Sequence, residues 1–323
     1  MERRCPYPRR SAGRALRQAA TANPQKSADA IVAETLKLVG LGEGQNLTKR
    51  ATTLDYPMKE GRQKTQESCP QNDSAERESY EGAQTLIGMV GDDLVEVQLT
   101  SGRMLEYILT PDNLNRAYRQ VKANKGSGGI DKMDVEHLLP YLRSHKVEIV
   151  ESLLDGKFRP NPVRRVEIPK DGGKMRQLGI PTVVDRVIQQ AIAQVLGLVY
   201  EPKFSDGSYG FRPGRSAHQA LRRAQEIIND GYKYCIDLDL EKFFDTVNQS
   251  KLVQLLSDTI KDGRVVSLIH KYLRAGVMIG HKFEETEQGV PQGGPLSPLL
   301  SNIMLNELDR ELERRGLPFV RYA

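Results

Sequence analysis

Cysteine is scarce in this chain, and long apolar runs are missing. The three cysteines, Cys5, Cys69 and Cys235, stand far apart, without the paired spacing of a metal site or the framework of a disulfide-rich domain. No apolar run approaches the roughly 20 residues that a helix needs to cross a bilayer. We therefore expect a reducing cytoplasm as the location and no membrane partner.

The first twenty residues are rich in arginine and almost free of acids. No apolar stretch follows Arg9 and Arg10, which argues against a secretory or twin-arginine signal. An organellar transit peptide stays open as an alternative, because such peptides share this scarcity of acids.

Charge of one sign does not dominate, since 47 Lys and Arg stand against 42 Asp and Glu. The net charge of +5 mildly favours a polyanionic partner. A length of 323 residues, 38% of them hydrophobic, is enough for one large domain or two modest ones with a real core.

Residues 1–105 are typical of a flexible leader, because they are rich in Ser, Gln, Thr, Glu and Lys and show no sustained periodicity. Residues 106–323 would then form the folded domain. Order should begin with a helix capped by Thr110 and started by Pro111. No internal repeat is visible, and helices alternate irregularly with short strands, which indicates an α+β fold.

Apolar periodicity predicts the remaining elements. Helices are expected near residues 135–142, 149–154, 182–195, 216–230, 251–275 and 296–315. Arg164 to Pro169 and Met175 to Ile180 should form a β-hairpin around Asp171-Gly172-Gly173. The apolar residues Tyr234, Ile236, Leu238 and Leu240 predict a packed strand over residues 233–240.

Several carboxylates lie at the end of that predicted strand: Asp237, Asp239, Glu241 and Asp245. Mg²⁺ prefers oxygen ligands and usually takes one or two carboxylates plus substrate phosphates. The segment is therefore compatible with a magnesium site of the polymerase type. The alternative is a strand whose polar residues simply face water, and spacing alone favours that alternative.

Two loops add to this pattern. Gln288 to Pro298 is rich in glycine and proline; its glycines would let the backbone approach a ligand closely, although such clusters are also ordinary before a helix. Tyr209 to Ser216 interleaves aromatic and arginine side chains, as base stacking and phosphate contact require. A basic, solvent-facing loop explains that composition equally well.

Taken together and in this order, these segments resemble group II intron reverse transcriptase/maturases from about Thr110 to Ala323. The resemblance rests on Tyr118 to Gly126 with Gly129-Ile130-Asp131, Ile168-Pro169-Lys170 with Lys174-Met175-Arg176, Tyr209 to Ser216, Asp239 to Asp245, and Gly289 to Pro298 continuing through Asn302. Phe319 to Ala323 looks like the opening of the family's Tyr-Ala-Asp-Asp motif. We therefore expect an N-terminal fragment that ends within this motif.

The resemblance implies the fingers and partial palm of a right-hand polymerase, truncated before the thumb. It implies that Asp239 is the first catalytic carboxylate and binds Mg²⁺ together with the main-chain carbonyl of Leu240, two ions being expected in the intact enzyme. By resemblance, the nucleotide-binding residues are Lys170 and Arg176 for the triphosphate, Phe244 under the sugar, and Gln292 at the nascent base pair. Those for RNA or template are Lys174, Arg212, Arg215, Gly293 and Gly294, while Phe243 is assigned to the core.

The implied function is RNA-directed DNA synthesis for a bacterial intron, with intron RNA, an RNA template, a DNA primer and deoxynucleoside triphosphates as partners. Because Asp239 lacks the two further aspartates of the family motif, we expect this chain by itself to be inactive. Two alternatives stay open: a non-enzymatic RNA-binding maturase or splicing cofactor, and a retron-type reverse transcriptase, which the segment Tyr209 to Ser216 disfavours.

Overall fold

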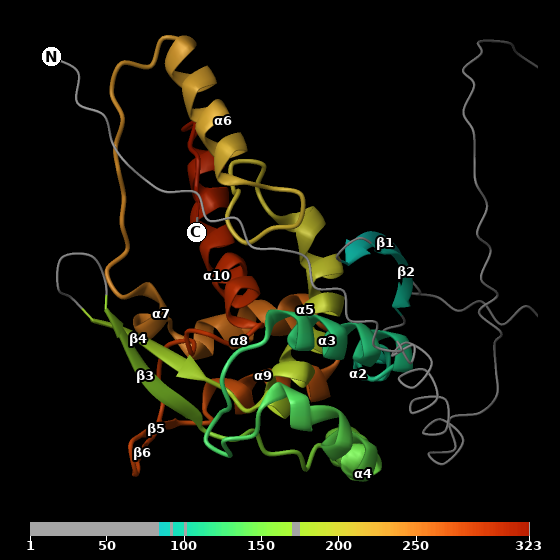
Figure 1. Ribbon diagram of the computed structural model, residues 1–323. Helices are drawn as coiled ribbons and strands as arrows, with labels where there is room; N and C mark the ends of the chain where they lie inside the picture. The colour runs from blue at the N-terminus through green and yellow to red at the C-terminus, as the bar shows by residue number, and fades with distance from the viewer. Residues whose placement is uncertain (1–83, 91–92, 100–101, 170–174, 323) are drawn as a thin grey trace, which may run out of the picture.

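The computed structural model describes residues 84–90, 93–99, 102–169 and 175–322, and helices and sheets are mixed within them (Figure 1). The expected α+β class is confirmed. Most of the predicted leader, residues 1–83, lies outside the described residues, and the division of the chain at residue 105 stays a prediction. None of the helices in the described ranges is both long and apolar enough to span a membrane.

An antiparallel hairpin precedes the helical body. Strand β1 (Gln84–Val90) pairs with β2 (Asp93–Leu99), and β1 lies against the long helix α5 (Val183–Tyr200). Helix α2 (Met104–Ile108) follows and is buried along one side. The sequence prediction had no regular element before Thr110, so this hairpin and α2 correct it.

Helix α5 is central to the helical body, and α3 (Pro111–Asn124) and α4 (Val135–Leu154) pack against it (Figure 1). It begins as predicted, because Thr182 Oγ1 accepts a hydrogen bond from Asp185 N and so satisfies a free N–H of the first turn. Helix α4 is continuous and contains Pro140, where the sequence predicted two helices. The polar residues between the two apolar sets simply continue the helix.

The larger sheet has the strand order β4-β3-β5-β6. Strands β3 (Val163–Pro169) and β4 (Met175–Ile180) are antiparallel, with Arg164 opposite Ile180, so the predicted hairpin is confirmed, although its turn lies outside the described residues. Strand β5 (Val277–Ile279) runs parallel to β3, and β6 (Lys282–Glu284) is antiparallel to β5. The sequence did not predict β5 or β6, each of which has only three residues.

Three helices complete the core: α8 (Gln249–Thr259), α9 (Gly263–Leu273) and α10 (Ser297–Arg314). Their positions confirm the helices predicted near residues 251–275 and 296–315. A short 3-10 turn, η1 (Glu201–Lys203), follows α5. Apolar residues of α5, α8, α9 and α10 belong to one buried cluster, whose burial is the main stabilising contribution to such a domain.

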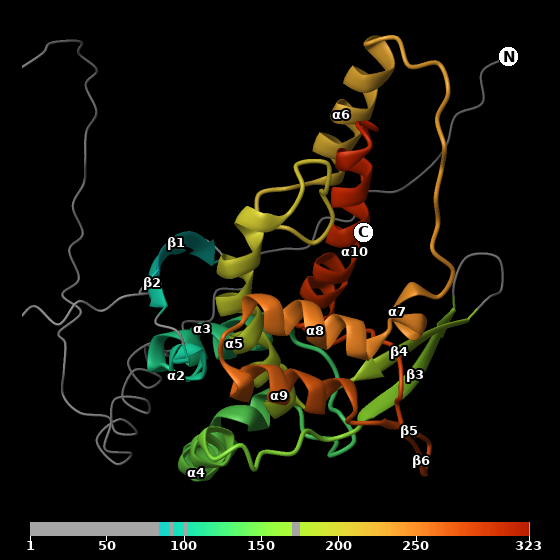
Figure 2. The same ribbon diagram turned by 180° about the vertical axis from the view of Figure 1, so that it is seen from behind.

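Helix α6 (Ala217–Asn229) starts with a capping box in which Ser216 and Gln219 satisfy each other's backbone N–H groups. In both views α6 and α10 project from the body, and the chain after α6 runs as an extended trace toward the short helix α7 (Phe243–Thr246) (Figures 1 and 2). The predicted strand over residues 233–240 is wrong, because no strand forms there.

The side chains of that segment explain the difference. Tyr234 and Ile236 are 95% and 83% exposed, and Leu238 and Leu240 are exposed as well. Their alternation is that of a strand, but no strand of the described chain pairs with the segment. A lone strand leaves its backbone N–H and C=O groups to water and gains no packing, so it is not stable as a strand.

Candidate active site

The loop from Gln288 to Leu296 is attached to α7 on one side. Val290 N donates to Phe244 O at 2.6 Å, and Gly289 N donates to Val247 O at 2.8 Å. Gly289 has a φ of 85°, and a Cβ there would lie 2.8 Å from Phe244 O. Both its conformation and the available space therefore require glycine.

The same loop contacts strand β4 on its other side. Gly179 N donates to Gln292 O at 2.7 Å, and Arg176 Nε donates to Gln292 Oε1 at 3.2 Å. Gly293 has a φ of 113° and approaches Gly179 O so closely that a Cβ would clash. The structure thus brings together Arg176, Gln292 and Gly293, which the sequence predicted from separate motifs.

The residues predicted in these two motifs differ in their exposure to solvent. Gly294 is buried against the side chain of Gln189 on α5, so it packs the loop onto the helix, whereas Gly293 is exposed. Arg176 is exposed on β4. Lys170 and Lys174, predicted beside Arg176, lie outside the described residues.

Phe243 and Phe244 form an edge-to-face pair with ring centroids 5.6 Å apart. Both rings are partly buried and pack against the core. The core position assigned to Phe243 agrees with this packing, and Phe244 shares it. The role of Phe244 beneath a nucleotide sugar stays a prediction.

Asp239 and Leu240 lie in the exposed segment just before α7. The Leu240 carbonyl accepts from Phe243 N at 3.3 Å. Across the described ranges, no group of three or more His, Cys, Asp or Glu side chains is placed to hold a metal ion. Asp239 would therefore supply one carboxylate ligand to Mg²⁺. The described residues do not by themselves fit a complete two-ion site.

Arg212, which the resemblance assigned to RNA, is buried in the structure, with its side chain 4% exposed. Its guanidinium donates to Glu201 Oε1 at 2.7 and 2.9 Å, and to the carbonyls of Ser205 at 2.6 Å and Ser208 at 2.9 Å. The centre of the Phe204 ring lies 5.4 Å from the Cζ atom of Arg212. A buried guanidinium with its donors satisfied fixes the loop, and contact of Arg212 with RNA stays a prediction.

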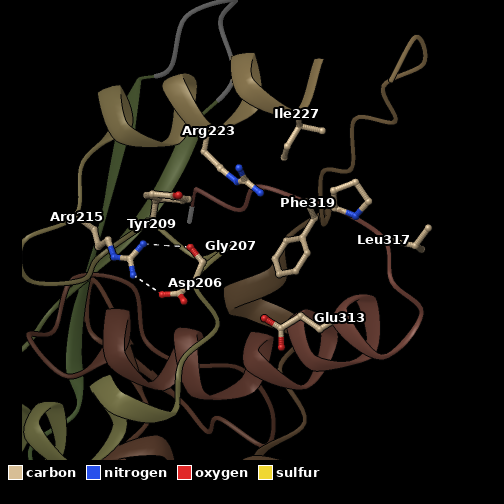
Figure 3. Close-up of a pocket in the computed structure, with 10 residues that line it drawn as sticks. Asp206, Gly207, Tyr209, Arg215, Arg223, Ile227, Glu313, Leu317 and Phe319 are labelled. Atoms are coloured by element: carbon tan, nitrogen blue, oxygen red, sulfur yellow. Dashed lines mark hydrogen bonds and ion pairs between the residues drawn. The ribbon is translucent and has the colours of Figure 1, made fainter. Parts of the chain in front are cut away.

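Arg215 is more accessible. Its guanidinium lies 5.1 Å from the centre of the Tyr209 ring and donates to Asp206 Oδ1 at 2.8 Å and to Asp206 O at 3.1 Å (Figure 3). The Asp206 side chain is 99% exposed, so this is a surface ion pair with which water and phosphate can compete. Arg215 therefore stays a candidate RNA contact.

Sequence reasoning missed a buried ion pair between Arg321 and Asp309 of α10. The Arg321 guanidinium donates to Asp309 Oδ2 at 2.7 Å, to Asn302 Oδ1 at 2.9 Å and to Ser208 Oγ at 2.8 Å. Tyr209 N also donates to Arg321 O at 2.8 Å. The chain near Arg321 is thereby attached to the loop that contains Arg212. A carboxylate on the apolar side of a predicted helix was the signal available at Asp309.

A second buried carboxylate, Asp185, lies at the start of α5. Its Oδ2 accepts from Thr182 Oγ1 at 2.6 Å and from Asn161 N at 3.3 Å, and its Oδ1 accepts from Tyr272 Oη at 3.3 Å. Burial raises the pKa of Asp185, and these hydrogen bonds oppose the rise. Burial and the neighbouring Asp185 raise the pKa of Tyr272 as well. Asp185 therefore links the residues just before β3, through Asn161, to α9, through Tyr272.

The sequence of this chain is similar to those of known proteins. Residues 168–323 match the family Reverse transcriptase (RNA-dependent DNA polymerase). The chain is 39% identical over 221 residues to the Group II intron-encoded protein LtrA of Lactococcus lactis subsp. cremoris. This match covers 68% of this chain and 36% of LtrA. It is also 39% identical over 221 residues to Protein YkfC of Escherichia coli (strain K12), and this match covers 67% of this chain and 58% of YkfC.

Among solved structures, a chain of a partial Cas6-RT-Cas1–Cas2 complex is 23% identical, with a TM-score of 0.46 over 70% of this chain and 38% of that one. The chain spans 36% and 58% of the lengths of the two curated relatives, respectively.

Proposed function

We propose that this chain supplies the fingers and palm residues of an RNA-directed DNA polymerase that serves a group II intron. The match of residues 168–323 to the reverse transcriptase family and the similarity to group II intron-encoded proteins support the proposal. The contact between Arg176 and Gln292, 116 residues apart in the chain, carries this proposal. The resemblance assigned both residues to the incoming nucleotide, and their proximity is what a shared nucleotide site requires.

In the proposed reaction, the 3′-hydroxyl of a primer attacks the α-phosphate of a deoxynucleoside triphosphate in line. Arg176 would bind phosphate oxygens with its planar guanidinium, and Lys170 would add a point charge. Gln292 and Gly293 would contact the template-primer. Arg176 lies on a paired strand and Gln292 in a hydrogen-bonded loop, which supports catalysis by positioning.

Phe244 is the residue we assign to the sugar of the incoming nucleotide. Its carbonyl accepts from Val290 N at 2.6 Å, so the position of its ring relative to the loop with Gln292 is restricted. A ring beneath the sugar would exclude a ribose 2′-hydroxyl by steric overlap. This assignment predicts a preference for deoxynucleotides over ribonucleotides.

Asp239 is the residue we assign to Mg²⁺, with the Leu240 carbonyl beside it. When bound, Mg²⁺ stabilises negative charge on the phosphate oxygens. Because no three-ligand group is present among the described residues, we infer that the 323-residue chain alone does not extend a primer. Binding of nucleic acid does not need that site, and RNA template, intron RNA and DNA primer are the partners we propose in a bacterial cytoplasm.

A binding measurement tests this proposal with the chain itself. Fluorescence anisotropy would compare an RNA template annealed to a DNA primer with the same RNA without primer. We expect tighter binding of the primed template, because a polymerase site holds the hybrid. Equal affinity for both would favour the non-enzymatic RNA-binding role, and binding of neither would contradict both.

A further inference from the structure

Phe211 combines two features that are each unfavourable for an isolated protein. Its φ of 56° lies in the left-handed region, where a bulky side chain is a genuine outlier. Its side chain is also largely solvent-exposed, with the residue at 56% exposure, so packing in the core does not offset the strain. The other non-glycine residues with positive φ in the described chain are lysines. Strain of this kind is a reason to look for function.

Hydrogen bonds on both sides hold Phe211 in this conformation. The carbonyl of Gly210 accepts from Asn302 Nδ2 at 2.9 Å, a buried contact with α10. On the other side, the guanidinium of Arg212 is buried and donates to Glu201 and to two loop carbonyls. The backbone of Phe211 is therefore fixed in advance, and its ring is presented to solvent without a large loss of freedom on binding.

The loop that contains Phe211 also borders a hollow with three arginines and one carboxylate, Glu226, which forms an exposed ion pair with Arg223 at 3.0 Å. Tyr209, Gly214 and Arg215 of this loop line a hollow of about 340 Å³ together with Arg222 and Arg223 of α6. Figure 3 shows Arg215 beside Tyr209, with Arg223 on the neighbouring helix. Arg222 and Arg223 are exposed. An exposed ring in the same loop as Arg215, which lines this hollow, fits a ligand that offers both a flat apolar face and phosphates.

We propose that Phe211 is a stacking platform for a nucleobase of single-stranded RNA, and that Arg215, Arg222 and Arg223 contact phosphates of the same strand. The inference rests on the proposed function, which makes RNA the partner. Bases in a duplex are already stacked, so an exposed ring can bind only a base that is free of a duplex. Stacking accepts every base because each has a π-face, so little sequence preference is expected.

Four variants of the chain test this proposal: Phe211→Ala, Phe211→Trp, Phe211→Gly and, as a control, Tyr141→Ala. Tyr141 is also an exposed aromatic residue, at 38%, but lies on α4. Affinity would be measured with a short oligouridylate and with an abasic ribose-phosphate strand of equal length. Loss of one stacking contact weakens binding roughly 5- to 150-fold.

We expect Phe211→Ala to weaken binding of oligouridylate within this range, Phe211→Trp and Tyr141→Ala to retain it, and none of the four to change binding of the abasic strand. Phe211→Gly separates function from structure, because glycine adopts a positive φ without strain. This variant should have a higher Tm than the parent chain and yet bind oligouridylate as weakly as Phe211→Ala.

The proposal is overturned if Phe211→Ala leaves oligouridylate affinity unchanged, if it weakens the abasic strand equally, or if Phe211→Gly lowers the Tm. Failure of the proposal alone is distinguishable from failure of the proposed function. In the first case the parent chain still binds a primed RNA template, and in the second it binds neither the primed nor the unprimed RNA.

Discussion

Arg176 Nε donates a hydrogen bond to Gln292 Oε1 at 3.2 Å, and this contact joins the β3–β4 hairpin to the loop that precedes α10. The main chain supports the same junction, since Gly179 N donates to Gln292 O at 2.7 Å. A displacement of the loop would therefore displace Gln292 from the strand that carries Arg176. The two segments form one unit in the proposed nucleotide site.

Two glycines with similar backbones should respond differently to a methyl group. Gly289 and Gly214 have φ values of 85° and 70°, but a Cβ meets the Phe244 carbonyl only at Gly289, and nothing lies within 4 Å at Gly214. We predict that Gly214→Ala lowers the free energy of unfolding by about 1 kcal/mol and Gly289→Ala by about 2–4 kcal/mol. Urea denaturation measures both, and equal losses would contradict the close approach at Gly289.

Arg212 and Arg215 should separate stability from RNA binding. Arg212→Ala leaves Glu201 and two carbonyls without their donor, and we expect a loss of about 3 kcal/mol. Arg215→Ala removes a surface pair worth less than about 1 kcal/mol, but should reduce the slope of log K against log salt by about 0.7 for single-stranded RNA. Denaturation and anisotropy at several salt concentrations measure both quantities. A stable Arg212→Ala chain with a reduced slope would show that Arg212 contacts RNA after all.

The buried pair of Arg321 and Asp309 should stabilise the chain far more than an exposed pair on the same helix. Their side chains are 11% and 0% exposed, against 69% and 39% for Arg314 and Glu311. We predict a loss of about 3–5 kcal/mol for Arg321→Ala, because Asp309 would remain as an unpaired buried charge. Arg314→Ala should cost less than about 1 kcal/mol. Comparable losses in chemical denaturation would refute the distinction.

The stability of the chain should depend on pH through Asp185. Because burial raises its pKa in the folded state, the folded chain holds this proton more tightly than the unfolded chain. The resulting stabilisation is complete below the unfolded pKa of about 3.9 and is lost as the pH rises through the folded pKa.

Asp185→Asn keeps a carbonyl acceptor for Thr182 and Asn161 but does not titrate. Urea unfolding at about pH 4, 6 and 8 should therefore show the parent chain losing stability relative to Asp185→Asn as the pH rises. A constant difference between the two chains, or one of opposite sign, would argue against the raised pKa.

Local signals predicted the elements whose determinants lie close together in the sequence. The helix starts at Thr182 and Ser216 were predicted, because a cap depends on residues within one turn. The β3–β4 hairpin likewise follows from alternation around a glycine-rich turn. The β1–β2 hairpin also had a signal, since Val95, Val97 and Leu99 alternate with polar residues, but the polar composition of the preceding residues concealed it.

Features that depend on distant partners could not be predicted in this way. Tyr234 and Ile236 alternate as in a strand, yet pairing decides whether a strand forms, and no described strand is available. Arg212 has the composition of an RNA contact, but its burial depends on Glu201 and on the fold of the loop. Arg176 and Gln292 were assigned by resemblance, and only the folded chain shows that they touch.

Primer extension tests the central claim most directly, using an RNA template, a DNA primer and two proteins: the 323-residue chain, and a chimaera in which the part of LtrA beyond its matching region continues from Ala323. We predict that the folded chimaera extends the primer, that Asp239→Ala abolishes this without lowering its Tm, and that the 323-residue chain alone does not extend it. Extension by the chimaera that survives Asp239→Ala, or robust extension by the 323-residue chain that Asp239→Ala abolishes, would contradict the account.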